Sequence, residues 1–168
     1  MKNSKILIIL VLGLISQLSH GCEPPDCDRL DCGTCGNACC SLEFLLQPDP
    51  YTLNIMISSL LQNGGPDAHY SFITSTDLRQ YNISCNFILQ GVHTTLVKKY
   101  QDTLNFAIFP ETSQKFFQSR MTAFSISQIG GAYCDEGQNY KNLIYLIKSL
   151  NIEFIENHVA GCQPRPRI

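Results

Sequence analysis

The chain has 168 residues, of which 15% are charged, and its formal net charge at pH 7 is -2. Because it contains no basic block, it lacks the electrostatic footprint of a nucleic-acid-binding protein, and we expect no nucleic-acid partner. Hydrophobic residues make up 44% of the chain, which is enough for a packed core.

Residues 1–21 have the plan of a secretory signal peptide: a basic start, an apolar run over residues 6–15, and a polar stretch that ends in small residues at Gly21. We expect cleavage before Cys22 and a secreted protein with no transmembrane segment after cleavage. The apolar run is too short for a membrane anchor, which needs roughly 20 residues. Since Cys22 would begin the mature chain, a lipoprotein is an alternative to soluble secretion.

A cysteine-rich segment, residues 22–40, follows the leader. Its Cys32-x-x-Cys35 spacing could hold a zinc ion, but an oxidising secretory compartment favours disulfides. Glycines around this pair predict a loop and therefore argue against a redox-active helix start. Cys39 and Cys40 are adjacent, so each is expected to bond to a different partner. We therefore predict disulfides here and neither a metal nor a cofactor.

The full chain has nine cysteines, an odd number, so one of them lacks an intramolecular partner. Cys85 and Cys22 are the best candidates for this thiol, which could carry a lipid or link two chains into a disulfide-bonded homodimer. The cysteines in the body of the chain are possible anchors for the N-terminal segment. The candidates for disulfide bonds are Cys22, Cys27, Cys32, Cys35, Cys39, Cys40, Cys85, Cys134 and Cys162.

Alternating apolar residues past the cysteine block predict a series of strands, at residues 42–47, 70–74, 82–89, 100–108 and 116–127. Between the first two, Asp49 is the predicted N-cap and Pro50 the first residue of a helix that ends at Gly64-Gly65-Pro66. The apolar stripe of this helix is expected to be Leu53, Met56, Ile57, Leu60 and Leu61.

A second helix is predicted near the end of the chain, with Asp135 as its N-cap and Gln138 closing a capping box. Its buried stripe is expected to be Tyr140, Leu143, Ile144, Ile147 and Leu150. Cys162 is expected to pin the residues beyond this helix to the body of the protein.

This order of elements predicts an α+β fold with an antiparallel sheet of about five strands and two helices on one face, preceded by a Cys-rich disulfide-linked segment. The predicted divisions are a signal peptide (1–21), the cysteine-rich segment (22–40), an α+β domain (41–151) and a C-terminal tail (152–168).

The segments YQDTLNF, AFSIS, IGG and DEGQNYKNL, within residues 99–148, resemble the uncharacterised family called domain of unknown function 1499. The positions that match the family pattern are Asp102, Ser125, Ser127, Gly130, Asp135, Gly137, Asn139 and Lys141. Phe124 and Gln128 stand where the family usually has arginines. Because the function of the family is itself unknown, the resemblance implies a fold and not an activity.

Considered without the resemblance, Ser125 and Ser127 share one strand face, and the chain then turns through Gly130-Gly131 to a helix start. Free backbone amides at a helix start attract a negative group. The candidate ligand-binding residues are Asp102, Ser125, Ser127, Gly130, Asp135, Asn139 and Lys141. Alternatively, the same side chains serve only to cap the helix and tie the turn by local hydrogen bonds.

The sequence contains no Gly-x-Ser-x-Gly elbow, no His-Glu-x-x-His and no phosphate loop, so we predict no catalytic residue. Asn82-Ile83-Ser84 is the one N-glycosylation sequon of the full sequence, and the strand predicted there would place Asn82 on an outward face.

Three functions are compatible with these patterns. The leading hypothesis is a non-enzymatic binding module for a small hydrophobic or lipid-like ligand, in a cavity lined by Phe72, Phe87, Phe106 and Leu143. The second is a hydrolase or transferase that uses Ser125, Ser127, Asp135 and Asn139. The third is an extracellular structural or adhesion domain.

Overall fold

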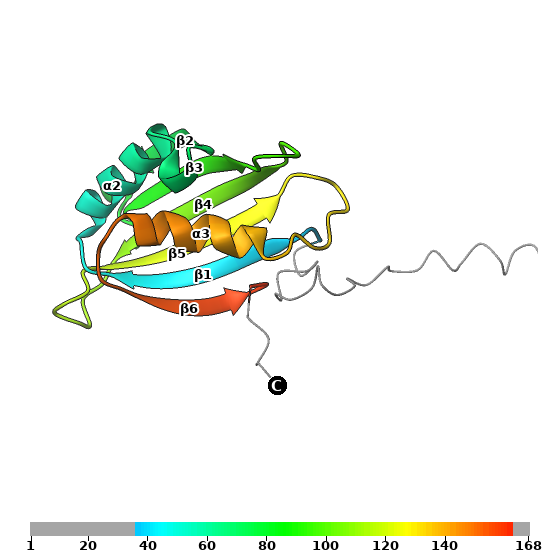
Figure 1. Ribbon diagram of the computed structural model, residues 1–168. Coiled ribbons are helices and arrows are strands. Elements are labelled where there is room, and N and C mark those ends of the chain that lie inside the picture. The colour runs from blue at the N-terminus through cyan, green and yellow to red at the C-terminus, as the bar shows by residue number, and fades with distance from the viewer. Residues whose placement is uncertain (1–35, 163–168) are drawn as a thin grey trace, which may run out of the picture.

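The structure, a computed structural model, describes residues 36–162 and has the expected α+β architecture (Figure 1). Its sheet has six strands, β1 (Cys39–Leu46), β2 (Tyr70–Asp77), β3 (Phe87–Thr94), β4 (Gln101–Pro110), β5 (Ser119–Ser127) and β6 (Phe154–Ala160). The helices are α2 (Pro50–Gln62) and α3 (Gln138–Ser149), with single 3-10 turns at Gly65–Asp67 and Arg79–Tyr81. The predicted leader and the cysteines at 22, 27, 32 and 35 lie outside the described residues.

The strand order is β2-β3-β4-β5-β1-β6, and every neighbouring pair is antiparallel. Strands β3, β4 and β5 follow one another along the chain, whereas β1 lies between β5 and β6, the two strands that flank α3 in sequence. Both helices cover the same face of the sheet, as Figure 1 shows, and the opposite face carries no helix of the described chain. This arrangement confirms the predicted antiparallel sheet with two helices on one face.

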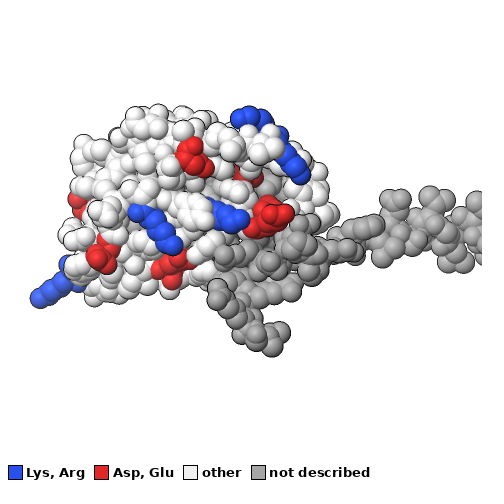
Figure 2. Space-filling view, viewed as in Figure 1, with Lys and Arg blue, Asp and Glu red and all other residues white. Residues whose placement is uncertain are grey.

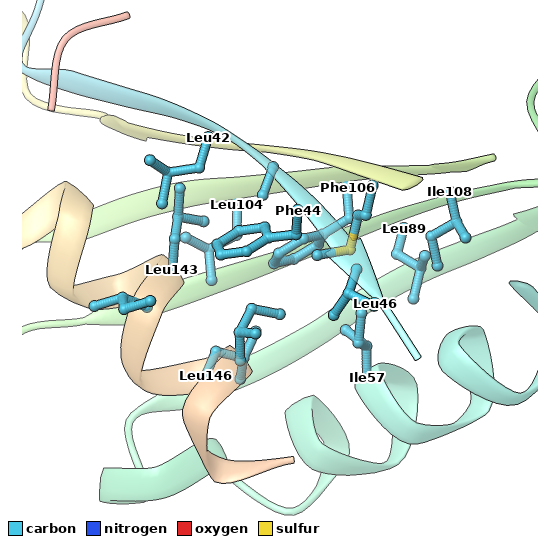
Figure 3. Packing of buried hydrophobic residues seen from close by; sticks show 14 of the residues in the cluster. Leu42, Phe44, Leu46, Ile57, Leu89, Leu104, Phe106, Ile108, Leu143 and Leu146 are labelled. Atoms are coloured by element: carbon cyan, nitrogen blue, oxygen red, sulfur yellow. The ribbon is translucent and has the colours of Figure 1, made fainter. Parts of the chain in front are cut away.

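The core lies between the helices and the sheet, where buried residues alternate along β1, β3, β4 and β5. Leu42, Phe44 and Leu46 of β1 point toward the helices, together with side chains of β4 such as Leu104 and Phe106 (Figure 3). The predicted helix stripes face this core: Leu53, Ile57, Leu61, Leu143, Ile144 and Ile147 are buried, and Leu60, Tyr140 and Leu150 pack against them.

The start of α2 confirms the predicted cap. Asp49 accepts hydrogen bonds from the backbone N–H groups of Tyr51 (2.9 Å) and Thr52 (3.2 Å), and Pro50 occupies the first turn. The hydroxyl of Thr52 also donates to Asp49 at 2.6 Å, and this bond is the main reason why the pKa of Asp49 is lowered. The carboxylate thus stabilises the helix in its ionised form.

Asp49→Ala is expected to lower the free energy of unfolding by about 1 kcal/mol at neutral pH, because the first-turn amides lose their acceptor. Since the folded-state pKa of Asp49 lies below the unfolded value, the contribution is present above the unfolded pKa and is lost as pH falls through the folded pKa. Urea unfolding at neutral and strongly acidic pH measures both effects. Asp49→Asn, which caps without a charge, should keep most of the stability at neutral pH; an equal loss for both variants would contradict the capping role.

The strand predicted at residues 82–89 is wrong in its first half. Leu78 donates its backbone N–H to the carbonyl of Asn86 at 2.8 Å, which closes a turn over the intervening residues, and Asn82 adopts a left-handed backbone with φ 52°. Ile83 is exposed, so its alternation with Phe87 does not reflect a shared face. β3 begins only at Phe87 and continues to Thr94, and the Asn82 sequon lies on an exposed turn rather than on a strand.

The predicted tail contains a further strand, β6, at the edge of the sheet beside β1. The periodicity of this segment is weak because its inward positions include Glu156 and His158, which pair with each other at 2.6 Å. The tail is nevertheless attached as expected: Cys162 forms a disulfide with Cys40, at a sequence separation of 122.

Of the disulfide candidates among the described residues, Cys39, Cys40, Cys134 and Cys162 are confirmed, whereas Cys85 is not disulfide-bonded, in agreement with the alternative prediction that it is the unpaired thiol. Cys40 bonds to Cys162, and Cys39 and Cys134 are also disulfide-bonded, so the adjacent cysteines 39 and 40 are not joined to each other. Cys85 is a free, half-buried thiol. Within residues 36–162, neither helix is long and apolar enough to cross a membrane.

Candidate functional site

The loop that leads into α3 differs from the predicted capping box. Gly137 is the N-cap, with a left-handed φ of 72°, and Asp135 lies two residues before it. Asp135 still accepts from the backbone N–H groups of Gly137 (3.0 Å) and Asn139 (2.6 Å), whereas the side chain of Gln138 donates forward to Asn142 at 2.7 Å. The prediction was wrong in position because Gly137 tolerates the left-handed turn, which lets the carboxylate reach the first turn from further upstream.

Five buried polar side chains connect this helix start to the sheet, and we refer to them as the polar network: Asp102, Ser125, Ser127, Asn139 and Asn142. Ser127 donates to one carboxylate oxygen of Asp102 at 2.9 Å, and Asn142 donates to the other at 2.8 Å. Ser125 donates to the side-chain oxygen of Asn139 at 2.5 Å. The network therefore ties β4, β5 and α3 together through side chains that are all buried.

Asn139 also links the polar network to the beginning of the described chain. Its amide group donates to the carbonyl of Ala38 at 3.0 Å and to Asp135 at 2.6 Å. Next to Ala38, the side chain of Asn37 donates to the carbonyl of Ser127 (3.1 Å) and accepts from the backbone N–H of Gly131 (3.1 Å). The end of the cysteine-rich segment thus braces the loop between β5 and α3.

Asp102 is a buried carboxyl group, only 3% exposed. Burial raises its pKa, and the nearby Asp135 raises it further, while the hydrogen bonds from Asn142 and Ser127 and the proximity of His93 act in the opposite direction. No lysine or arginine of residues 36–162 forms an ion pair with Asp102 or Asp135. The ionised form of Asp102 is therefore held by hydrogen bonds without a compensating positive charge.

His93 lies on β3 directly opposite Asp102 in the sheet register. Its Nε2 atom is 3.0 Å from Asp67, its ring lies 4.6 Å from the ring of Tyr70, and its buried Nδ1 has no partner among the described residues. Tyr70 in turn donates its hydroxyl to the backbone carbonyl of Asn142 at 2.9 Å, and burial raises its pKa. The polar network thus continues toward β3 and β2.

A cavity of about 540 Å³, which we call the end pocket, lies beside the polar network. It is open to solvent and is bordered by the β3–β4 hairpin loop (residues 95–100) and the β5–α3 loop (residues 128–137), which project from the same end of the sheet in Figure 1. Its apolar lining is Leu96, Val97, Tyr100, Ile129 and Ala132, and its charged lining is Lys98, Asp102, Asp135 and Glu136.

The structure brings only some of the predicted ligand-binding residues to this pocket. Asp102, Ser127 and Asp135 line it. Ser125 and Asn139 are fully buried behind it, in the polar network.

The other two predicted residues lie apart from the lining. Gly130 is an exposed residue of the β5–α3 loop, and Lys141 donates to the backbone carbonyl of Glu136 at 3.1 Å. Sequence reasoning missed Asn142, although a second asparagine three residues after Asn139 on a buried helix stripe signals a paired polar contact. It also missed the apolar hairpin residues Leu96 and Val97, which are unusual at the tip of an exposed loop.

The cavity expected under the helices is filled instead. Phe87, Phe106 and Leu143 are buried in the core, and Phe72 packs against it. Figure 3 shows Phe106 and Leu143 in the layer between the sheet and the helices. The interior of the protein is therefore a packed core, and space for a ligand lies at the end of the sheet.

On the face of the molecule shown in Figure 2, acidic and basic side chains are dispersed among uncharged ones. The visible charges therefore form no continuous patch on that face, and the acidic residues of the end pocket are a local grouping.

The serines are poorly arranged for catalysis. Both hydroxyl groups already donate, to Asp102 and to Asn139, and no histidine of residues 36–162 hydrogen-bonds to either of them. In the same part of the chain, no group of three or more His, Cys, Asp or Glu side chains is placed to hold a metal ion. Comparison with protein-family models, with curated proteins and with solved structures found no match to this chain.

Proposed function

We propose that the protein is a secreted, non-enzymatic binding module whose end pocket holds a small ligand with an apolar body and a polar group. The leader and the disulfides support secretion. The volume of about 540 Å³ falls within the range of small-molecule sites.

The observation that carries the proposal is the exposure of apolar side chains around one hollow. Val97 is 86% exposed, Leu96 is 65% exposed and Ile129 is 39% exposed, and all three line the end pocket. Apolar side chains gathered in this way around a cavity are characteristic of a binding surface. The side chains of the polar network beneath them already form hydrogen bonds within the protein. A ligand would therefore meet a preformed site.

Titration of the isotope-labelled chain with 1-octanol, followed by amide NMR shifts, tests the proposal. We expect shifts in residues 95–100 and 128–137 that saturate, because the alkyl chain would cover the apolar lining. The double variant Leu96→Ser and Val97→Ser should weaken binding by about tenfold or more, since two buried apolar contacts are lost.

Val159→Ser is the matched control, because Val159 is 58% exposed on β6 and does not line the pocket. It should leave octanol binding unchanged. Shifts spread over the whole chain, no saturable shifts, or equal effects of the pocket variant and the control would overturn the proposal.

A further inference from the structure

Resting on the proposed function, we infer that the end pocket selects a positively charged ligand, a small amphipathic amine or quaternary ammonium. Its cationic head would lie at the carboxylates of Asp102 and Asp135, and its apolar body would cover Leu96, Val97 and Ile129. This assignment goes beyond a preference for an apolar ligand because it specifies the sign of the charge.

The first argument is the imbalance of charge in the pocket lining. Three acidic side chains, from Asp102, Asp135 and Glu136, face a single basic one, from Lys98. Asp102 comes from β4 and the other two acids from the β5–α3 loop, so the fold brings together carboxylates that are distant in sequence. Charges of one sign that line a concave, partly desolvated site focus its field and attract the opposite charge.

The second argument is that the two inner carboxylates are fixed in position and still have acceptor capacity. Asp102 receives one hydrogen bond on each oxygen, from Ser127 and from Asn142. Asp135 is held by the amides of Gly137 and Asn139. A carboxylate offers about four lone-pair sites, so Asp102 can accept further hydrogen bonds from the N–H groups of an amine, whereas a quaternary ammonium, which has no N–H, would be attracted by charge alone. Because both groups are already oriented, binding requires little reorganisation.

The third argument concerns the buried charge itself. Asp102 is only 3% exposed and forms no ion pair with a lysine or arginine of residues 36–162, and burial raises its pKa. A cation beside Asp102 would supply positive charge next to its carboxylate. An anion would instead add to the repulsion that Asp135 already exerts on the Asp102 carboxylate.

The fourth argument is that the rim of the pocket already accommodates a cation. The ammonium nitrogen of Lys98 lies 5.6 Å from the centroid of the Tyr100 ring, and both residues line the pocket. This distance is within the range of a cation–π contact. A ligand cation would contact the same Tyr100 ring, near the carboxylates of the pocket lining. The charge of Lys98 would oppose its binding.

Three probes with the same alkyl chain test the inference on the full chain: octyltrimethylammonium, 1-octanol and octanoate, each followed by NMR titration. We expect the ammonium to bind about tenfold more tightly than octanol, and octanoate to bind most weakly. Added salt should reduce the advantage of the ammonium and leave octanol binding unchanged.

Two variants at pocket-lining residues outside the polar network change the charge of the end pocket without removing any side chain of that network. Lys98→Gln should tighten ammonium binding by about threefold and Glu136→Gln should weaken it by a similar factor, since each changes one neighbouring charge. Octanoate should respond in the opposite sense. Lys115→Gln, an exposed residue of the β4–β5 loop that does not line the pocket, is the control for net charge and should have no effect.

The outcomes separate the two proposals. If octanol binds at the pocket but the ammonium binds no more tightly, or if octanoate binds best, the charge inference is overturned and the binding function stands. If none of the three probes binds at residues 95–100 and 128–137, the proposed function is overturned and the inference with it. Identical effects of Lys98→Gln and Lys115→Gln would also contradict the inference.

Discussion

Replacing both Cys40 and Cys162 with alanine is expected to lower the free energy of unfolding by about 4 kcal/mol. The disulfide joins residues separated by 122 positions, so it restricts the unfolded chain over nearly the whole described domain. In the folded state it fastens the end of β6, an edge strand, to the start of β1. The double variant is preferable to a single one because it leaves no buried, unpaired thiol from this bond.

Urea unfolding followed by circular dichroism, without reductant, measures this effect. Cys85→Ser is the control, because it also removes a sulfur atom but breaks no disulfide, and it should cost less than about 1 kcal/mol. Hydrogen exchange provides a second measurement: protection should fall most in β6, whereas the central pair of β4 and β5 should change least. A double variant as stable as the wild-type protein would show that packing alone holds β6 in place.

Asn139→Ala is expected to lower the free energy of unfolding by about 3 kcal/mol. Asn139 is fully buried, and its side chain accepts from Ser125 and donates to Ala38 and Asp135. Truncation leaves the hydroxyl of Ser125 and the carbonyl of Ala38 without this partner, and both residues are buried. The loss should also loosen the β5–α3 loop that forms one wall of the end pocket.

Thermal and urea unfolding measure the cost, and two variants sharpen its interpretation. Asn157→Ala removes the same side chain from an exposed position on β6 and should change stability by less than about 0.5 kcal/mol. Asn139→Asp keeps the shape but places a second carboxylate beside Asp135, so it should also be clearly destabilising. If Asn139→Ala were no more costly than Asn157→Ala, the polar network would not contribute to stability.

Local patterns predicted the elements whose signals lie within a few residues of one another. The start of α2 followed from Asp49 and Pro50, because a cap and its amides are neighbours in sequence. The alternation along β4 likewise predicted the burial of Leu104, Phe106 and Ile108, whereas Tyr100, at the start of the predicted strand, is exposed and precedes β4.

Predictions that depended on distant partners were less accurate. The segment at residues 82–86 alternates like a strand, but it turns because Leu78 pairs with Asn86, a contact that periodicity does not reveal. The apolar residues of β6 stand in two adjacent pairs, Phe154-Ile155 and Val159-Ala160, and therefore do not alternate; the segment is a strand because it pairs with β1, and the disulfide between Cys40 and Cys162 holds its end. In both cases tertiary contacts outweigh local preference.

The residues of the candidate site also fall into those that local sequence patterns indicated and those that only the folded structure brings together. The sequence alone indicated the polar residues Asp102, Ser127 and Asp135, since polar side chains at a strand end and a helix start stand out against an apolar pattern. It did not indicate that Leu96, Val97 and Ile129 share a cavity with them.

Sequence periodicity was thus sufficient for the α+β class and the helix faces, because each depends on spacing along one segment. The pairing of Asp102 with Ser127 in the sheet register is what brings the β3–β4 hairpin beside the β5–α3 loop. The end pocket and its acidic charge therefore arise from the folded arrangement, since they are made by segments about 30 residues apart that meet only when β4 and β5 pair.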